Sequence, residues 1–169
     1  RSAFNPNAKL PGYRAYDMRK SACQRTNADP GRVQMPERKV YVTIDKDAPV
    51  LAFDVSKGSS HCQGFFSFGK PSGKPIKAAH SRSGIAAAEK ISETLEEQAG
   101  ARPKVVMEST GVYSKPVVRW AESMGLEVFL ISPLESAKVG KGRVRPTRTD
   151  ALDCVVLAEV AYTRNARRH

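Results

Sequence analysis

The chain has 169 residues, of which 40% are hydrophobic and 27% are charged. A chain of this length buries one substantial hydrophobic core, and two full domains are not expected. Its apolar runs all fall short of the roughly 20 residues that span a bilayer. No signal-peptide pattern opens the sequence, so we expect a protein of the reducing cytoplasm with no membrane partner.

Basic residues clearly outnumber acidic ones. Lys and Arg total 28 against 17 Asp and Glu, which gives a formal net charge of +11. This excess favours a polyanionic partner such as nucleic acid, although a basic solvated surface is the alternative. The cysteines and histidines have neither zinc-site nor disulfide spacing, and each histidine is interpreted as incidental.

Residues 1–47 differ in composition from the rest of the chain. Arg1–Gln34 is rich in Asn, Pro, Arg, Lys and Ala, and it has no helical or strand periodicity. We therefore expect an N-terminal extension that is disordered or not native to the protein. Since the first residue is Arg, we expect a fragment or an over-extended reading frame, with Met35 as the natural start. A basic arm that binds nucleic acid is the alternative.

Residues 48–169 have the pattern of one α/β domain. Short apolar runs between turn-forming residues predict three strands, followed by a helix that Ser83 caps and Gly100 ends. A short strand, a helix and another strand come next, and the last helix is capped by Thr149. Three strands followed by alternating strands and helices predict a mixed sheet with helices packed on it. The predicted strands are Val50–Val55, His61–Phe68, Lys74–Ala79, Val105–Met107 and Leu126–Ile131. The two later predicted helices are Tyr113–Met124 and Asp150–Tyr162.

Four carboxylates stand at positions where the predicted elements bring them together. Asp54 and Glu108 each follow apolar residues in a predicted central strand. A buried carboxylate without a partner costs several kcal/mol or stays protonated. Asp150 and Asp153 are three residues apart and therefore share a helix face, although the helix dipole alone also favours acids in a first turn.

Oxygen ligands of this kind suit a hard divalent cation. The sequence therefore predicts a Mg²⁺ site, with Mn²⁺ as a possible substitute. Four carboxylates can hold two metal ions about 4 Å apart, the arrangement used in phosphodiester chemistry.

A basic segment without periodicity, Leu134–Arg148, precedes the last predicted helix. Its cations face only one acid in the segment, Glu135. Lys and Arg of this kind neutralise phosphates without reading sequence. The predicted nucleic-acid-binding residues are Lys138, Lys141, Arg143, Arg145 and Arg148.

Three motifs in this order resemble a known family. They are Asp-Val-Ser-Lys at 54–57, Met-Glu-Ser-Thr-Gly-Val-Tyr at 107–113, and Thr-Asp-Ala-Leu-Asp at 149–153 followed by Leu157-Ala158. They look like the Asp-Glu-Asp-Asp (DEDD) transposases of bacterial insertion sequences, of the insertion-sequence one-ten group. The N-terminal domain of that group is similar to the RuvC junction resolvase.

The resemblance implies an RNase H-like (RuvC-like) fold, with Asp54 on the first strand, Glu108 on the fourth, and Asp150 and Asp153 on the last helix. It also implies a magnesium site and metal-dependent phosphodiester chemistry on DNA during transposition, in some members guided by a structured RNA. A homo-oligomer is expected for the full-length protein. Family members continue into a second domain with a serine nucleophile, which the sequence up to His169 does not contain. We therefore expect this chain to be the metal-binding catalytic half of the protein, incomplete by itself and unable to complete strand exchange alone.

Other functions remain open from the residues alone. A stand-alone structure-specific nuclease, similar to a junction resolvase, needs only the four acids. A non-catalytic nucleic-acid-binding module needs only the basic segment. An ATPase or sugar kinase is disfavoured, because the first strand lacks the Gly-rich turn that holds phosphates in such folds.

Overall fold

The computed structural model describes the backbone of residues 40–141 and 150–169, and the side chains of all of these except 150–152. Eight strands in this part of the chain form one mixed sheet. They are β1 (Tyr41–Val42), β2 (Val50–Ser56), β3 (Ser59–Ser67), β4 (Lys70–Pro71), β5 (Ile76–Ala79), β6 (Lys104–Glu108), β7 (Val128–Ile131) and β8 (Ala166–Arg168). Their order across the sheet is β1-β8-β7-β6-β2-β3-β4, and β5 also pairs with β3.

The centre of the sheet is parallel. β2 runs parallel to β6, and β6 runs parallel to β7, whereas β3 is antiparallel to β2. The central strands are buried on both faces, which is why their sequences read as continuous apolar runs. The mixed α/β architecture expected from the sequence is confirmed.

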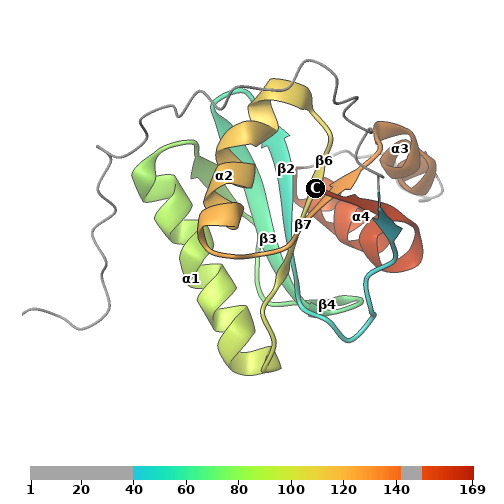
Figure 1. Ribbon diagram of the computed structural model, residues 1–169, viewed down its shortest axis with the longest axis horizontal. Coiled ribbons are helices and arrows are strands. Elements are labelled where there is room, and N and C mark those ends of the chain that lie inside the picture. The colour runs from blue at the N-terminus through green and yellow to red at the C-terminus, as the bar shows by residue number, and fades with distance from the viewer. Residues whose placement is uncertain (1–39, 142–149) are drawn as a thin grey trace, which may run out of the picture. The chain divides into compact units, whose positions relative to one another are not determined.

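Helices cover both faces of the sheet (Figure 1). They are α1 (Arg82–Ala99), the short 3₁₀ turn η1 (Gly111–Ser114), α2 (Lys115–Ser123), α3 (Pro133–Lys141) and α4 (Asp150–Thr163). α1 and α2 lie on one side, and α3 and α4 lie on the other. Among the described residues, no helix has both the length and the apolar character needed to cross a membrane.

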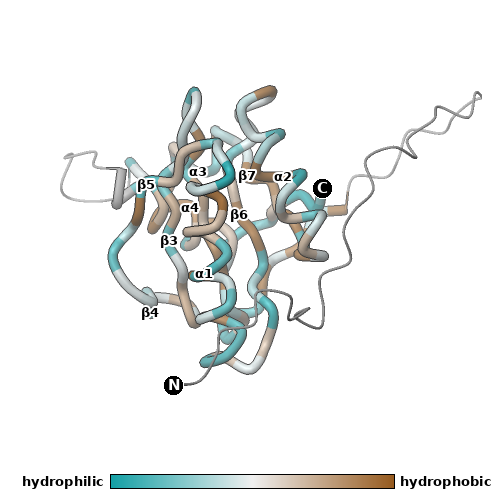
Figure 2. The backbone as a smooth tube through the Cα atoms, turned by 90° about the vertical axis from the view of Figure 1, so that its left-hand side faces the viewer, coloured by the Kyte–Doolittle hydropathy of each residue, from teal (hydrophilic) through white to brown (hydrophobic). Residues whose placement is uncertain are grey.

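Each face of the sheet packs its own hydrophobic cluster, and Figure 2 shows hydrophobic residues, in brown, along the strands. Phe53 and Met107 face α1 and α2, where the Phe53 ring meets Trp120 edge to face at a centroid distance of 5.7 Å. Ala52 and Val106 face α4 on the opposite side. This alternation along β2 and β6 fixes the direction of the residues that follow them.

The ends of α1 follow the expected capping chemistry. Gly100 ends the helix with φ 67, and its N–H donates to the carbonyl of Glu96, so the predicted end is confirmed. The N-cap is Ser81, not Ser83, because the Ser81 hydroxyl accepts the N–H of Gly84 at 3.4 Å.

A helix forms where the sequence indicated an aperiodic segment. Residues Pro133–Lys141 form α3, and none of them is buried. Only Val139 of this helix packs, partly buried, on the core, so the helix has no apolar period by which the sequence could reveal it. Its start is instead marked by Ser132, whose hydroxyl accepts the N–H of Leu134 at 3.4 Å and whose carbonyl accepts the N–H of Glu135 at 2.9 Å.

The folded unit also begins earlier than residue 48. β1 pairs with β8, and Ile44 is 2% exposed in the cluster under α4. β1 has two residues and β8 has three, too few for a detectable alternation. Residues 1–39 of the expected extension lie outside the described residues.

The close contact between α1 and β5 gives a stability prediction. A Cβ added to Gly84 would clash with the backbone of Ala79, above all with its carbonyl oxygen. Gly84→Ala should therefore lower the free energy of unfolding by about 1–3 kcal/mol, although Ala is the better helix former. Gly73→Ala is the matched control, since its added Cβ would meet nothing within 4 Å. Urea unfolding of both variants measures the difference, and equal stabilities would contradict the contact.

A second prediction concerns Tyr162, whose hydroxyl donates to the carbonyl of Ala48 at 2.7 Å. Burial raises the pKa of Tyr162 above its ordinary value. The contribution of Tyr162 to the free energy of unfolding should persist below about pH 10, the pH at which an unfolded Tyr ionises. It should decline as the pH rises further. Tyr162→Phe should cost about 1 kcal/mol at neutral pH. Denaturant unfolding between pH 8 and 11 should show a smaller alkaline loss for the variant; equal losses would refute this assignment.

Candidate active site

Asp54 and Glu108 lie side by side where β2 and β6 approach their carboxyl ends. The two strands are in parallel register up to Phe53 and Met107, and each acid is the next residue. Neighbouring strands are about 4.8 Å apart. Since Phe53 and Met107 face α1 and α2, both acids face the side covered by α4. Both are half-buried, so the sheet places two carboxylates together on one face.

The first turns of α4 lie over the same region. The Cys154 thiol donates to the carbonyl of His61 at 3.4 Å, and His61 is the cross-strand partner of Asp54. Asp153, the residue before Cys154, is half-buried. The start of α4 is thus anchored over the strand next to Asp54. The backbone of Asp150 begins α4, but its side chain lies outside the described residues.

α3 contributes a hydroxyl to this site. Ser136 Oγ donates to Glu108 Oε1 at 2.5 Å and also to the carbonyl of Pro133 at 3.1 Å. A hydrogen bond to a carboxylate is stronger than one between neutral groups, so it fixes the orientation of Glu108. Sequence reasoning missed Ser136, because it lies 28 residues from Glu108 and carries no motif of its own.

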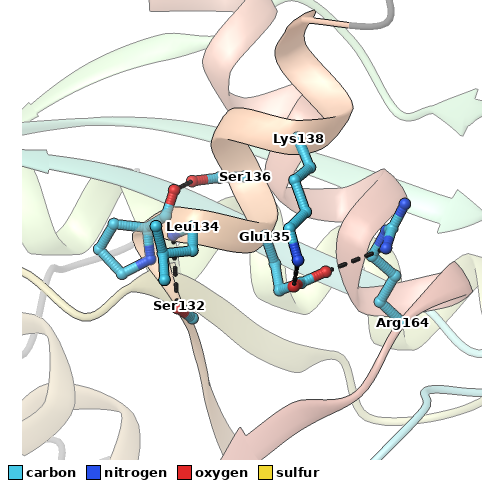
Figure 3. A network of polar contacts seen from close by, with 7 residues as sticks. Ser132, Leu134, Glu135, Ser136, Lys138 and Arg164 are labelled. Carbon is cyan, nitrogen blue, oxygen red and sulfur yellow. Dashed lines mark hydrogen bonds and ion pairs between the residues drawn. The ribbon is translucent and has the colours of Figure 1, made fainter.

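An ionic contact joins α3 to Arg164, the residue that follows α4 (Figure 3). Glu135 Oε1 accepts from Lys138 Nζ at 2.7 Å, and Glu135 Oε2 accepts from Arg164 Nη1 at 3.0 Å. The hydrogen bond from Lys138, with the charge of Arg164, holds the pKa of Glu135 below its ordinary value. Lys138, one of the predicted phosphate-binding cations, is therefore engaged within the protein.

The comparison with protein families identifies the chain. A transposase family, designated DEDD_Tnp_IS110, matches residues 51–169. The chain belongs to this family of DEDD transposases. A comparison with individually curated proteins finds no match.

In this transposase the predicted acids do not form a closed metal cage among the described side chains. No group of three or more His, Cys, Asp or Glu side chains in the described part lies close enough to hold a metal ion. Asp54 and Glu108 are adjacent, and Asp153 lies on the covering helix. The fourth acid, Asp150, belongs to the side chains that are not described.

The predicted nucleic-acid-binding residues are only partly visible. Lys138 and Lys141 lie in the last turn of α3 and are exposed. Arg143, Arg145 and Arg148 lie outside the described residues.

His61, interpreted as incidental from the sequence, is placed directly across from Asp54. A two-residue turn at Lys57-Gly58 would have predicted this pairing, because it sets Ser56 opposite Ser59 and hence Asp54 opposite His61.

The Glu135 contact gives a testable prediction. Glu135→Gln should speed amide hydrogen exchange in α3, because Val139 is only a partly buried anchor for this helix and the variant cannot form the two ion pairs. Since the pKa of Glu135 is lowered, the stabilisation of α3 by the Glu135 carboxylate should be present above the ordinary Glu pKa of about 4.3. This stabilisation should disappear as the pH falls below that value. Glu127→Gln, which removes pairs with Lys104 and Arg168, is the control. Equal α3 exchange in both variants would show that the contact does not hold α3.

Proposed function

We propose that the chain performs metal-dependent phosphodiester chemistry on DNA during transposition of an insertion sequence. One observation supports this most: β2 and β6 set Asp54 and Glu108 side by side, half-buried, under a helix that begins with two further acids. Membership of a transposase family supplies the reaction class.

We further propose that the domain is RNase H-like, of the RuvC type. If the two-residue strands β1 and β4 are set aside, β2 is the first strand in the chain and β6 is the fourth. Asp54 then lies on the first strand and Glu108 on the fourth, as the family resemblance implies. The arrangement β5-β3-β2-β6-β7 around a central β2 is consistent with this assignment.

Asp54, Glu108, Asp150 and Asp153 are the proposed metal ligands and catalytic residues. Carboxylate oxygens are the donors that Mg²⁺ and Mn²⁺ prefer, so the donor chemistry fits. A metal bound there would activate the attacking water or hydroxyl and stabilise the leaving oxygen. In the protein itself, the Ser136 hydroxyl orients Glu108, and the start of α4, anchored by Cys154, lies over the strand beside Asp54.

DNA is the proposed substrate, because the formal net charge is +11 and the family is a transposase family. Lys141 and the three arginines at 143, 145 and 148 are proposed to contact its phosphates, with Lys138 beside them. A structured guide RNA, a homo-oligomeric full-length protein and a cytoplasmic location are part of the same proposal.

Metal binding is tested by thermal unfolding. Mg²⁺ or Mn²⁺ at about 100 times its Kd should stabilise the protein by about 2.7 kcal/mol, which corresponds to a Tm rise of about 5–10 °C for a domain of this size. The double variant Asp54→Asn/Glu108→Gln should fold but lose this response. Glu97→Gln, which removes an exposed acid of α1, should keep it. If the double variant responds to metal as fully as wild type, the proposed ligands are wrong.

The same substitutions test the chemistry. A protein that joins this domain to the family's serine domain should, with Mg²⁺, cut or join strands of DNA that carries the ends of its insertion sequence, and the same protein with the double substitution should not. DNA binding without any metal-dependent strand cleavage or joining would favour a non-catalytic binding module instead.

A further inference from the structure

One row of the sheet continues from the acids to the edge strand β5. Asp54 pairs with His61 on β3, and His61 pairs with Lys77 on β5. Directly opposed residues of antiparallel strands project on the same face, with Cβ atoms about 5 Å apart. Lys77 therefore lies about 10 Å from Asp54, on the same face of the sheet. Ile76 packs with the cluster on the opposite face, which agrees with this alternation.

Two more cations are brought to the same corner of the molecule. Lys57 lies in the turn that closes β2 and β3, whose last pair is Ser56 with Ser59. The N–H of His80 donates to the carbonyl of Gly58 in that turn at 2.9 Å. Arg82, two residues further, starts α1. We call Lys57, Lys77 and Arg82 the basic corner.

The corner is held by contacts other than those of its cations. The hydroxyl of Ser60 and Nε2 of His80 are 2.8 Å apart, and Ser59 pairs with Ala79 at the end of β5. Gly84 fits against Ala79 so closely that a Cβ would clash. The hairpin, the end of β5 and the start of α1 are thus joined, and the three charges keep a defined spacing.

The three cations do not serve the stability of the described fold. Each is exposed, and none has an ion pair with an acid among the described side chains. No acid lies in the first turn of α1. A cation at a helix N-terminus is opposed by the helix dipole, so Arg82 costs stability where it lies. Some cations elsewhere do have ion pairs: Arg102 with Glu96, Lys104 and Arg168 with Glu127, and Arg164 with Glu135. What sets the corner apart from other exposed lysines is its position beside the acids.

The acids lie between two groups of cations. β2 and β6 are central, β5 lies on one side with the basic corner, and β7 leads to α3 with Lys138 and Lys141 on the other. Substrate bound at the acids would therefore have positive charge on both flanks.

We propose that the basic corner binds the DNA backbone on the β5 side of the acids, so that the DNA crosses this end of the sheet from β5 towards α3. This inference rests on the proposed DNA substrate and adds a second phosphate-binding surface. At about 10 Å from Asp54, Lys77 would contact the same DNA strand close to the reacting phosphate. The corner has exposed charge without apolar residues for stacking, which favours phosphate contact over base readout.

The test compares two triple variants of the full chain. Lys57→Ala/Lys77→Ala/Arg82→Ala removes the basic corner. Lys70→Ala/Lys74→Ala/Lys90→Ala is the control, because it removes three exposed cations away from the acids and causes the same change in net charge. Binding of a labelled DNA duplex is measured over a range of salt concentrations without divalent metal.

The corner variant should bind all duplex sequences more weakly, and its log–log salt slope should fall by about 0.9 for each phosphate that the protein no longer neutralises. The control should keep the wild-type slope. Both should melt close to wild type, since exposed charges contribute little to stability. Lys77→Arg/Arg82→Lys should keep binding, because charge alone is required.

Several results would overturn the proposal. One is a corner variant with the same slope as the control. Another is a Lys77→Ala variant that self-associates while its DNA binding is unchanged. That result would mean that Lys77 only prevents the edge strand β5 from pairing with another chain. Weaker binding to a structured RNA with DNA binding intact would assign the corner to RNA. If wild type itself binds no DNA, the proposed function fails together with this inference; if wild type binds and only the comparison fails, the proposed function stands.

Discussion

The parallel register between β2 and β6 is the constraint on which the site depends. Because side chains alternate along a strand, a slip of one residue would turn Asp54 or Glu108 away from α4 and into the apolar cluster with Phe53 and Trp120. An acid buried there without a partner would cost several kcal/mol. The apolar residues before each acid therefore have two roles: they stabilise the core, and they determine the face of the sheet on which the acid lies.

The two helices on this face are held in different ways. α4 packs with many buried residues against the sheet, and its first turns are fixed at His61 by Cys154. α3 has no fully buried residue; it is held by the partly buried Val139, by Glu135 and by the bond from Ser136 to Glu108. The carboxylates on the strands and the covering helix are therefore rigidly placed, while the neighbouring cationic helix depends in part on the exposed ion pairs of Glu135, which salt and low pH weaken.

The sequence predicted the parts of the fold that depend on burial. Central strands, the end of α1 at Gly100 and the α/β class followed from apolar runs and capping residues. It could not reveal α3, which packs a single valine on the core and has no apolar period, or the strands β1 and β8, which are too short to alternate. Likewise, the adjacency of Asp54 and Glu108 was expected from their strands, whereas Ser136 and His61 join the site through tertiary contacts and cross-strand register.

The pairing of β1 with β8 has a consequence for how the chain folds. Val42 lies opposite Ala166, so this edge of the sheet cannot form until nearly all of the intervening chain is available. Closing so long a loop is entropically costly and slows folding in proteins rich in distant contacts. During synthesis on a ribosome, β2, β3 and β5 can pair early because they are neighbours in sequence. Ile44, by contrast, becomes buried only after α4 has been made and covers it. Synthesis would therefore expose the face that later holds the acids for longer than any other part of the core.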